Sequence, residues 1–284
     1  MHTFFDDFHT IDQTKLWLSP YLLIHQAFVN GGNVPLHAWL NDYFVDNKII
    51  LNNYQDKPLI FSHQNDLPHG TAYEQFIGDF HKIPTRDNLH DWFGACVWSV
   101  FGRAKAILNK HHLRHIFVDD TQNKRNRVRD AITVFDENGI VLAVSTEQIG
   151  QQIASRLYHF DWQHSLVAPR QYWHNPDQPN NQTHAQSFLF GHALLEQLIN
   201  PRKNLCGHTL VVSVQAEFFG WTMDEKLAYL DQLLAQQLDD WLGRDDATPR
   251  DLQPLPVLGI PYFWANQDDE FYQDTSVFRA GRRR

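Results

Sequence analysis

The chain contains 284 residues, which is enough for one large domain or two small ones around a sizeable core. Apolar residues make up 43% of it and aromatic residues 13%, and this composition excludes an intrinsically disordered protein. The formal net charge of -9 argues against a general nucleic-acid coat, and the sequence lacks the run of about 18 apolar residues that a transmembrane helix requires.

The first 80 residues predict a helical N-terminal region. Between Asp12 and Phe28, the pair Ser19-Pro20 predicts two short helices, because Ser is a good N-cap and Pro suits the first position of a helix. Another helix is expected after Pro35. Residues 47–87 carry scattered Pro and Gly, so they predict mostly irregular structure.

The strongest helix signal begins at Asn88 and ends near Lys110. Asn88 is a good N-cap, and Asp91 places a carboxylate near the positive end of the helix. Apolar residues follow at helical spacing: Leu89, Phe93, Cys96, Val97, Val100, Ala104 and Leu108. A helix with so wide an apolar stripe is expected at the centre of the fold.

A β-hairpin is predicted next. Residues 131–135 and 140–144 are rich in β-forming side chains, and residues 136–139 (Asp-Glu-Asn-Gly) join them. Asn-Gly favours a hairpin turn because both residues tolerate positive φ. Asp136 and Glu137 are then most simply solvated residues of this turn.

The second half of the chain predicts further helices and one strand. Ser145 and Gln148 have the spacing of a capping box and predict a helix that continues to Phe160. Thr222 and Glu225 form a second capping box ahead of a clean amphipathic helix. We also expect a helix over 189–199, a strand over 209–215 and an irregular tail from residue 254.

These elements predict an α+β protein, predominantly helical, with a small and mainly antiparallel sheet. No composition shift or linker divides the chain, so residues 1–284 are expected to form one domain. Within it we distinguish the helical N-terminal region (residues 1–80), the region 81–279 and a basic tail at 280–284.

Four motifs in the region 81–279 resemble a known family. They are residues 88–93 with Lys105 and Asn109; 129–131 leading into 135–139; 190–196 with 207–208; and 255–261 with Asn266, 271–272, Asp274 and 277–279. In this order they resemble the bacterial domain-of-unknown-function family 3025. The resemblance implies a bacterial, cytoplasmic protein and no particular activity. A cytoplasmic location also agrees with only two cysteines and with an N-terminus unlike a secretory signal.

The pair His90 and Asp91 is the first candidate site. Both lie in the opening turn of the predicted central helix, and Gly94 leaves open space beside the imidazole. The functional interpretation is a catalytic or metal-binding pair in a pocket, with Lys105 on the same helix face as Asp91 to contact substrate. The structural interpretation is that Asp91 supports the helix N-terminus and His90 is a hydrogen-bonded core residue.

The pair His192 and Glu196 is the second. Their i, i+4 spacing places both on one helix face, within reach of a metal ion or of each other. If this helix lies beside His90, then His192, Glu196 and His90 would form a mixed His/carboxylate metal site with an open position. A buried His–Glu hydrogen bond that joins two helices is the alternative.

Arg129 and Asp130 are the third candidate, expected at the start of the hairpin. Arg129 could hold an anionic substrate with Asp130 as a catalytic carboxylate, or the two could pair structurally.

Three functions follow from these candidates. The first is a hydrolase-type enzyme with a His/Asp/Glu site, with or without a divalent metal. The second is a non-enzymatic binding protein whose polar motifs are structural. The third is nucleic-acid binding through the basic run from Lys124 to Arg129, which ranks last because no nucleic-acid motif accompanies it. The substrate and partners are not predicted, and no membrane association is expected.

Overall fold

The N-terminal helices pack against the rest of the core. The computed structural model describes residues 4–29, 34–119, 126–178 and 182–281. The first elements are α1 (Phe4–Phe8), the 3-10 helix η1 (Leu16–Tyr21), α2 (Leu22–Val29) and α3 (Leu36–Asp46). The predicted break is present, but Pro20 lies inside η1 instead of opening a helix. Tyr21 joins this region to the main sheet, because its hydroxyl donates to the Leu189 carbonyl at 2.5 Å.

Residues 47–87 are more regular than predicted. They contain β1 (Ile60–His63), the 3-10 helix η2 (Gln64–Asp66), α4 (Tyr73–Phe80) and β2 (Lys82–Thr85). The two strands form a parallel sheet in which Ile60 pairs with Lys82. Strands of four residues are too short to show a periodic pattern, and for this reason the sequence does not reveal them.

The predicted central helix is two helices, α5 (Leu89–Val100) and α6 (Gly102–Asp119), separated at Phe101. Asn88 caps α5 as predicted, and its side chain accepts from the Asp91 N–H at 2.8 Å. The cap of α6 comes from a distant residue. Asp231 accepts the N–H groups of Arg103 and Ala104 at 3.1 and 2.9 Å, so the break depends on a tertiary contact.

The predicted hairpin is wrong. Residues 127–138 form α7 (Arg127–Asn138), which leads directly into β3 (Gly139–Ser145). Its buried residues recur at helical spacing: Val128, Ala131, Ile132 and Phe135. Gly139 has a φ of -70°, so no left-handed turn is required. Asp136 and Glu137 therefore lie in the last turn of a helix, and Arg129 and Asp130 lie in its first turn.

The remaining elements are α8 (Gln148–Tyr158), the π-helix η3 (Gln163–Val167), η4 (Arg170–Tyr172), β4 (Ala185–Leu189), α9 (His192–Gln197), β5 (Cys206–Val214), η5 (Ala216–Gly220), α10 (Met223–Leu242), η6 (Pro249–Asp251), β6 (Gln253–Pro256), η7 (Val257–Gly259) and α11 (Asp269–Gln273). The capping box of Thr222 and Glu225 is confirmed at the start of α10. The one predicted at Ser145 is wrong, because this residue ends β3 and its hydroxyl bonds His184.

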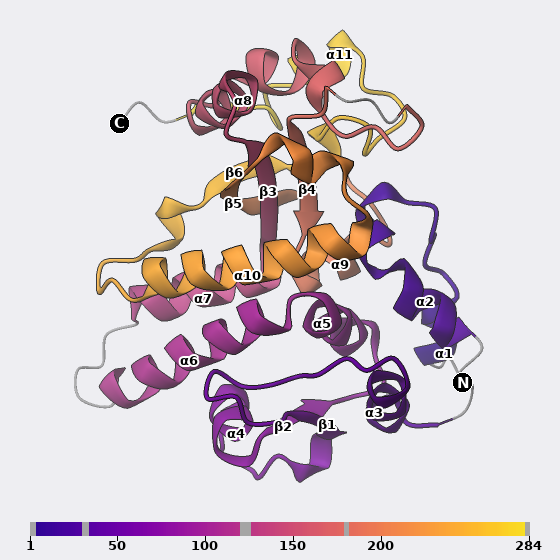
Figure 1. Cartoon of the computed structure of the whole chain (residues 1–284), viewed down its shortest axis with the longest axis vertical. Helices are drawn as coiled ribbons and strands as arrows, with labels where there is room; N and C mark the ends of the chain where they lie inside the picture. Colours follow the sequence, from indigo (N-terminus) through magenta and orange to yellow (C-terminus); the bar gives the residue numbers. More distant parts are fainter. Residues whose placement is uncertain (1–3, 30–33, 120–125, 179–181, 282–284) are drawn as a thin grey trace.

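The main sheet has the order β4-β3-β5-β6 and is mixed. Strand β3 is buried along its length and pairs antiparallel with β4 and parallel with β5. Figure 1 shows this sheet in the upper half of the molecule, with α8 above it, α7 and α10 crossing below it, and the small β1-β2 sheet at the opposite end. The α+β class predicted from the sequence is confirmed. Within the described ranges, no helix combines the length and apolar character needed to cross a membrane.

Candidate metal centre

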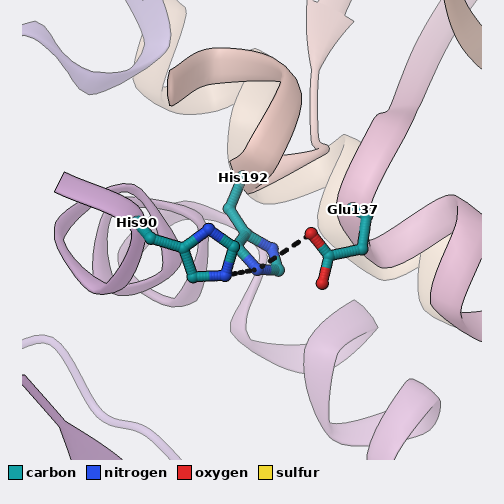
Figure 2. A group of neighbouring side chains, drawn as sticks. All are labelled: His90, Glu137 and His192. Atoms are coloured by element: carbon teal, nitrogen blue, oxygen red, sulfur yellow. Dashed lines mark hydrogen bonds and ion pairs between the residues drawn. The ribbon is translucent and has the colours of Figure 1, made fainter. Parts of the chain in front are cut away.

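Two histidines and a glutamate from three helices meet at one point. His90 lies in the first turn of α5, His192 is the first residue of α9, and Glu137 is in the last turn of α7. The two Nε2 atoms are 3.1 Å apart, and Glu137 Oε2 lies 3.7 Å from Nε2 of His192 (Figure 2). One nitrogen or oxygen from each residue lies within 4.8 Å of the other two, so these side chains could hold a metal ion.

The strand register brings Glu137 and His192 together. β3 and β4 are antiparallel neighbours in which Ile140 pairs with Leu189. The residues just before β3 and just after β4 therefore lie opposite each other. At this crossing a Cβ on Gly191 would lie 2.5 Å from three backbone atoms of residues 137–139, so only glycine fits without displacement.

Helix α5 supplies the third group. It packs against α9, and this contact places His90 over the start of α9. His90 is also bound by Glu196, one turn further along α9, whose Oε2 lies 3.0 Å from His90 Nδ1. His192 and Glu196, which are four residues apart on α9, therefore both contact the imidazole of His90. His192 lies at its Nε2, and Glu196 lies at its Nδ1.

The hydrogen bonds fix which ring nitrogens carry protons. His192 Nδ1 lies 2.8 Å from the Asp136 carbonyl oxygen, which can only accept, so Nδ1 donates. His90 Nδ1 likewise donates to the Glu196 carboxylate. Burial lowers the pKa of His192 to about 4, against the opposing pull of the Asp136 carboxylate, so this ring is neutral at pH 7. Its Nε2 therefore presents a lone pair to His90.

The two Nε2 atoms are 3.1 Å apart, a distance that fits either an N–H···N hydrogen bond or two nitrogens on one metal ion. If His90 is also neutral, both Nε2 atoms carry lone pairs that point at each other, which is repulsive. A shared proton or a metal ion removes the repulsion. Two nitrogens bound to a tetrahedral zinc at about 2.0–2.1 Å lie roughly 3.3 Å apart, which is close to the separation here.

The pKa values of the two carboxyl groups beside His192 are shifted in opposite directions. Burial and the neighbouring Asp136 charge raise the pKa of Glu137, so this carboxylate gains from a nearby cation. Burial alone would raise the pKa of Asp136. The Lys105 ammonium at 2.5 Å reverses this effect and keeps the pKa of Asp136 below its ordinary value. Lys105 itself is buried and lies over the Trp98 ring.

A cavity of about 290 Å³ opens beside the two histidines. A Cβ on Gly94 would meet no atom within 4 Å, so the open space predicted next to His90 is present. The wall combines apolar and ion-paired side chains, among them Phe61, Tyr73, Ile83, Arg86, Asp91, Ala95, Trp98 and Lys105. Such a mixture of apolar surface and a few placed polar groups is usual for small-molecule sites.

Asp91 and Lys105, two site residues predicted from the sequence, line this cavity, and each forms an ion pair there. Asp91 accepts both Arg86 Nε and Nη2, at 3.0 and 2.9 Å, in addition to the Arg86 N–H. Lys105 is bound to Asp136. Their expected catalytic and substrate-binding roles remain predictions.

Arg129 and Asp130, the third candidate pair, do not line the cavity beside the histidines. Arg129 lines a second, adjoining cavity, whereas Asp130 is not among the lining residues of either cavity. Within the basic run, Lys124 and Arg125 lie outside the described residues, and Arg127 is exposed at the start of α7.

Glu137 is the residue that sequence reasoning misses. The Asn-Gly pair assigns it to a hairpin turn, where a solvated carboxylate is not a candidate ligand. The helical spacing of Val128, Ala131, Ile132 and Phe135 is the available signal, because it places residue 137 at a buried helix end.

Comparison with known proteins identifies a family and nothing more. Residues 59–282 match the model of the family described as "Protein of unknown function (DUF3025)". No curated protein and no solved structure matches the chain. The resemblance inferred over 81–279 is confirmed, and the match extends upstream to include β1 and α4.

Proposed function

The chain belongs to the DUF3025 family, and because that family supplies no activity we propose a function from the site itself. The protein is a hydrolase that holds one divalent metal ion of the zinc class. Nε2 of His90, Nε2 of His192 and the carboxylate of Glu137 are the three ligands. Such an ion would leave a position for water or substrate, and all three residues line the cavity of about 290 Å³ from which either would come.

The observation that carries this proposal is the pair of facing Nε2 atoms whose Nδ1 atoms are both engaged. A metal-bound histidine typically donates its other N–H to a carboxylate or a carbonyl, which fixes the tautomer and makes the ring a better ligand. His90 has Glu196 in this role, and His192 has the Asp136 carbonyl. Both rings are thus already oriented as ligands.

Three protein ligands with one open position are the pattern of catalytic zinc sites, and structural zinc sites usually have four. Zinc lowers the pKa of a bound water to about 7, which supplies hydroxide for hydrolysis at neutral pH. Trp98, Phe61 and Ile83 contribute apolar surface to the cavity in which such a water would lie. Asp91 and Lys105, which also line this cavity, are proposed to contact the substrate.

Metal analysis of protein purified without a histidine tag tests the ligand set. We expect about one zinc, manganese or iron per chain by mass spectrometry. His90→Ala, His192→Ala and Glu137→Ala should each remove most of it, whereas His164→Asn, at an exposed histidine paired with Asp161, should not. Metal-free wild-type protein that takes up no added zinc would reject the proposal.

Hydrolysis is tested separately from binding. The zinc-loaded protein is assayed on chromogenic carboxylic esters, phosphate esters and peptides, and the His192→Ala variant is assayed in parallel. We expect cleavage of one class, lost in the variant and after chelation. A loaded protein inactive on all three classes would instead favour the non-enzymatic binding protein.

A further inference from the structure

Tyr73 lines the cavity of the proposed metal centre and is not part of the ligand set. It is the first residue of α4, and it shares the wall of the 290 Å³ cavity with His90, Glu137 and His192. Helix α4, which lies beside the small β1-β2 sheet (Figure 1), supplies none of the proposed ligands. The cavity is at the small end of the range for small-molecule sites, so a molecule bound at the metal would also meet much of its wall.

The hydroxyl is the enclosed end of the Tyr73 side chain. The residue as a whole exposes 41% of its surface, yet burial is the main cause that raises the pKa of the hydroxyl well above its ordinary value. The charges of Glu74, Asp91 and Asp136 raise this pKa further, and all three residues line the cavity. Arg86 opposes them with the smallest of these effects. The phenol therefore keeps its proton at neutral pH and lies among the polar groups of the cavity wall.

This hydroxyl has no hydrogen-bond partner among the residues that the structure describes. Its charged neighbours have partners of their own. Asp91 is paired with Arg86, and the Asp136 carboxylate accepts from the Lys105 ammonium. An enclosed donor without a partner gains a hydrogen bond when a molecule with a suitable oxygen enters the cavity.

Asn109 fixes the turn of α4 that carries Tyr73. It lies on α6 and is 2% exposed. Its side-chain amide donates to both the carbonyl oxygen and the carboxylate of Glu74, at 2.9 and 2.7 Å. Because Glu74 directly follows Tyr73, these two bonds hold the first turn of α4 against α6. The backbone that carries the phenol is thus in place before a ligand arrives, as an effective catalytic hydrogen-bond donor requires.

The charges of the cavity wall favour an uncharged substrate. The wall carries four carboxylates and two cations: Glu74, Asp91, Asp136 and Glu137 against Arg86 and Lys105. The divalent metal ion of the proposed function would bring the sum to zero, since His192 is neutral. Such a wall offers no net attraction to an anionic phosphate ester. The carbonyl group of a neutral ester or amide requires only a hydrogen-bond donor near its oxygen.

We propose that Tyr73 is a further catalytic residue, whose hydroxyl donates a hydrogen bond to the carbonyl oxygen of a neutral ester or amide in this cavity. The inference rests on the proposed function and narrows its substrate class. When hydroxide adds to the carbonyl carbon, the electron pair of the C=O double bond moves onto the oxygen, and the hydrogen bond from Tyr73 stabilises this charge. The pair then re-forms the C=O bond and expels the leaving group, which takes the proton of the added hydroxyl. Tyr73 keeps its own proton throughout.

The test measures the binding of acetohydroxamate, a small zinc ligand with a carbonyl oxygen, to the zinc-loaded full-length chain by calorimetry. We expect Tyr73→Phe to weaken this binding about tenfold, because one hydrogen bond to a charged oxygen is lost. Its zinc content and free energy of unfolding should equal those of the wild type, since the hydroxyl has no partner in the free protein. Tyr54→Phe is the matched control, because Tyr54 is 39% exposed and is not among the residues that line the cavity. Its affinity for acetohydroxamate should be unchanged.

Turnover is the second readout. On an ester or amide that the zinc-loaded protein cleaves, Tyr73→Phe should lower kcat about 100-fold with little change in KM, because the donor acts mainly in the transition state. Equal acetohydroxamate affinity in Tyr73→Phe and wild type overturns this inference and leaves the metal centre intact, as does cleavage confined to phosphate esters. A chain that binds no zinc, or that binds it and cleaves none of the three substrate classes, rejects the proposed function itself and the role of Tyr73 with it.

Discussion

At the scale of single residues, Glu196 acts on the proposed metal through His90. Its carboxylate accepts the Nδ1 proton of His90 at 3.0 Å, which orients the ring and increases the electron density at Nε2. Replacement by Gln keeps the shape and removes the charge. We expect Glu196→Gln to lower zinc affinity by about 10- to 100-fold, measured by competition with a chromophoric chelator.

Glu217→Gln provides the comparison for this experiment, because it removes an exposed carboxylate from η5. Its zinc affinity should equal that of the wild type. If Glu196→Gln behaves in the same way, the carboxylate does not tune His90 and the proposed arrangement of ligands is incorrect.

The individual site residues are predictable to different degrees. His90, His192 and Glu196 can be selected because each lies at a helix start or at i, i+4 spacing beside a glycine, and these are local patterns. The meeting of His90 with His192 can only be posed as a hypothesis, because it depends on the packing of α5 against α9. Glu137 is missed because the hairpin prediction is wrong.

At the scale of elements, the site depends on the crossing of the α7–β3 junction with the β4–α9 junction. Gly191→Ala places a methyl group against the backbone of residues 137–139, so the two junctions must separate. We expect a loss of about 1–3 kcal/mol in the free energy of unfolding and weaker zinc binding, measured by urea denaturation and chelator competition.

Gly94→Ala is the control for Gly191→Ala. Both variants exchange glycine for alanine near the proposed site, but the methyl group at position 94, in the cavity wall, meets no atom within 4 Å. It should raise the unfolding free energy by up to about 1 kcal/mol, because Ala favours the helix. Equal effects of the two substitutions would show that close approach at Gly191 is not what positions His192.

Local signals predict elements well where a cap and a stripe agree, as at Asn88 and at Thr222 with Glu225. They fail where tertiary contacts decide. The break at Phe101 is stabilised by Asp231 from α10, 128 residues later than Arg103. Residues 131–135 have β-forming side chains, yet their buried face in α7 makes them helical.

At the scale of the whole molecule, buried histidines make stability depend on pH. Burial lowers the pKa of His25, His174 and His192 to about 4 from 6.5, with the charge of Lys226 contributing at His174. In the unfolded chain these groups protonate near pH 6.5, so between 6.5 and 4 the unfolded state binds more protons. The contribution of these histidines to the free energy of unfolding is therefore fully present above pH 6.5, and it is lost as the pH falls from 6.5 to 4.

Each of the three histidines contributes a slope of up to about 1.4 kcal/mol per pH unit in this window. Urea unfolding of the chelated protein from pH 4.5 to 7.5 measures it, with metal removed because zinc binding adds its own pH dependence. Below pH 6, His192→Asn and His25→Asn should each reduce the slope of the unfolding free energy against pH by the contribution of one histidine, up to about 1.4 kcal/mol per pH unit. Above pH 7, the curves of unfolding free energy against pH for both variants should run parallel to that of the wild type. A His192→Asn slope equal to that of the wild type would mean that His192 is already protonated in the folded protein, and its Nε2 would then have no lone pair to offer a metal.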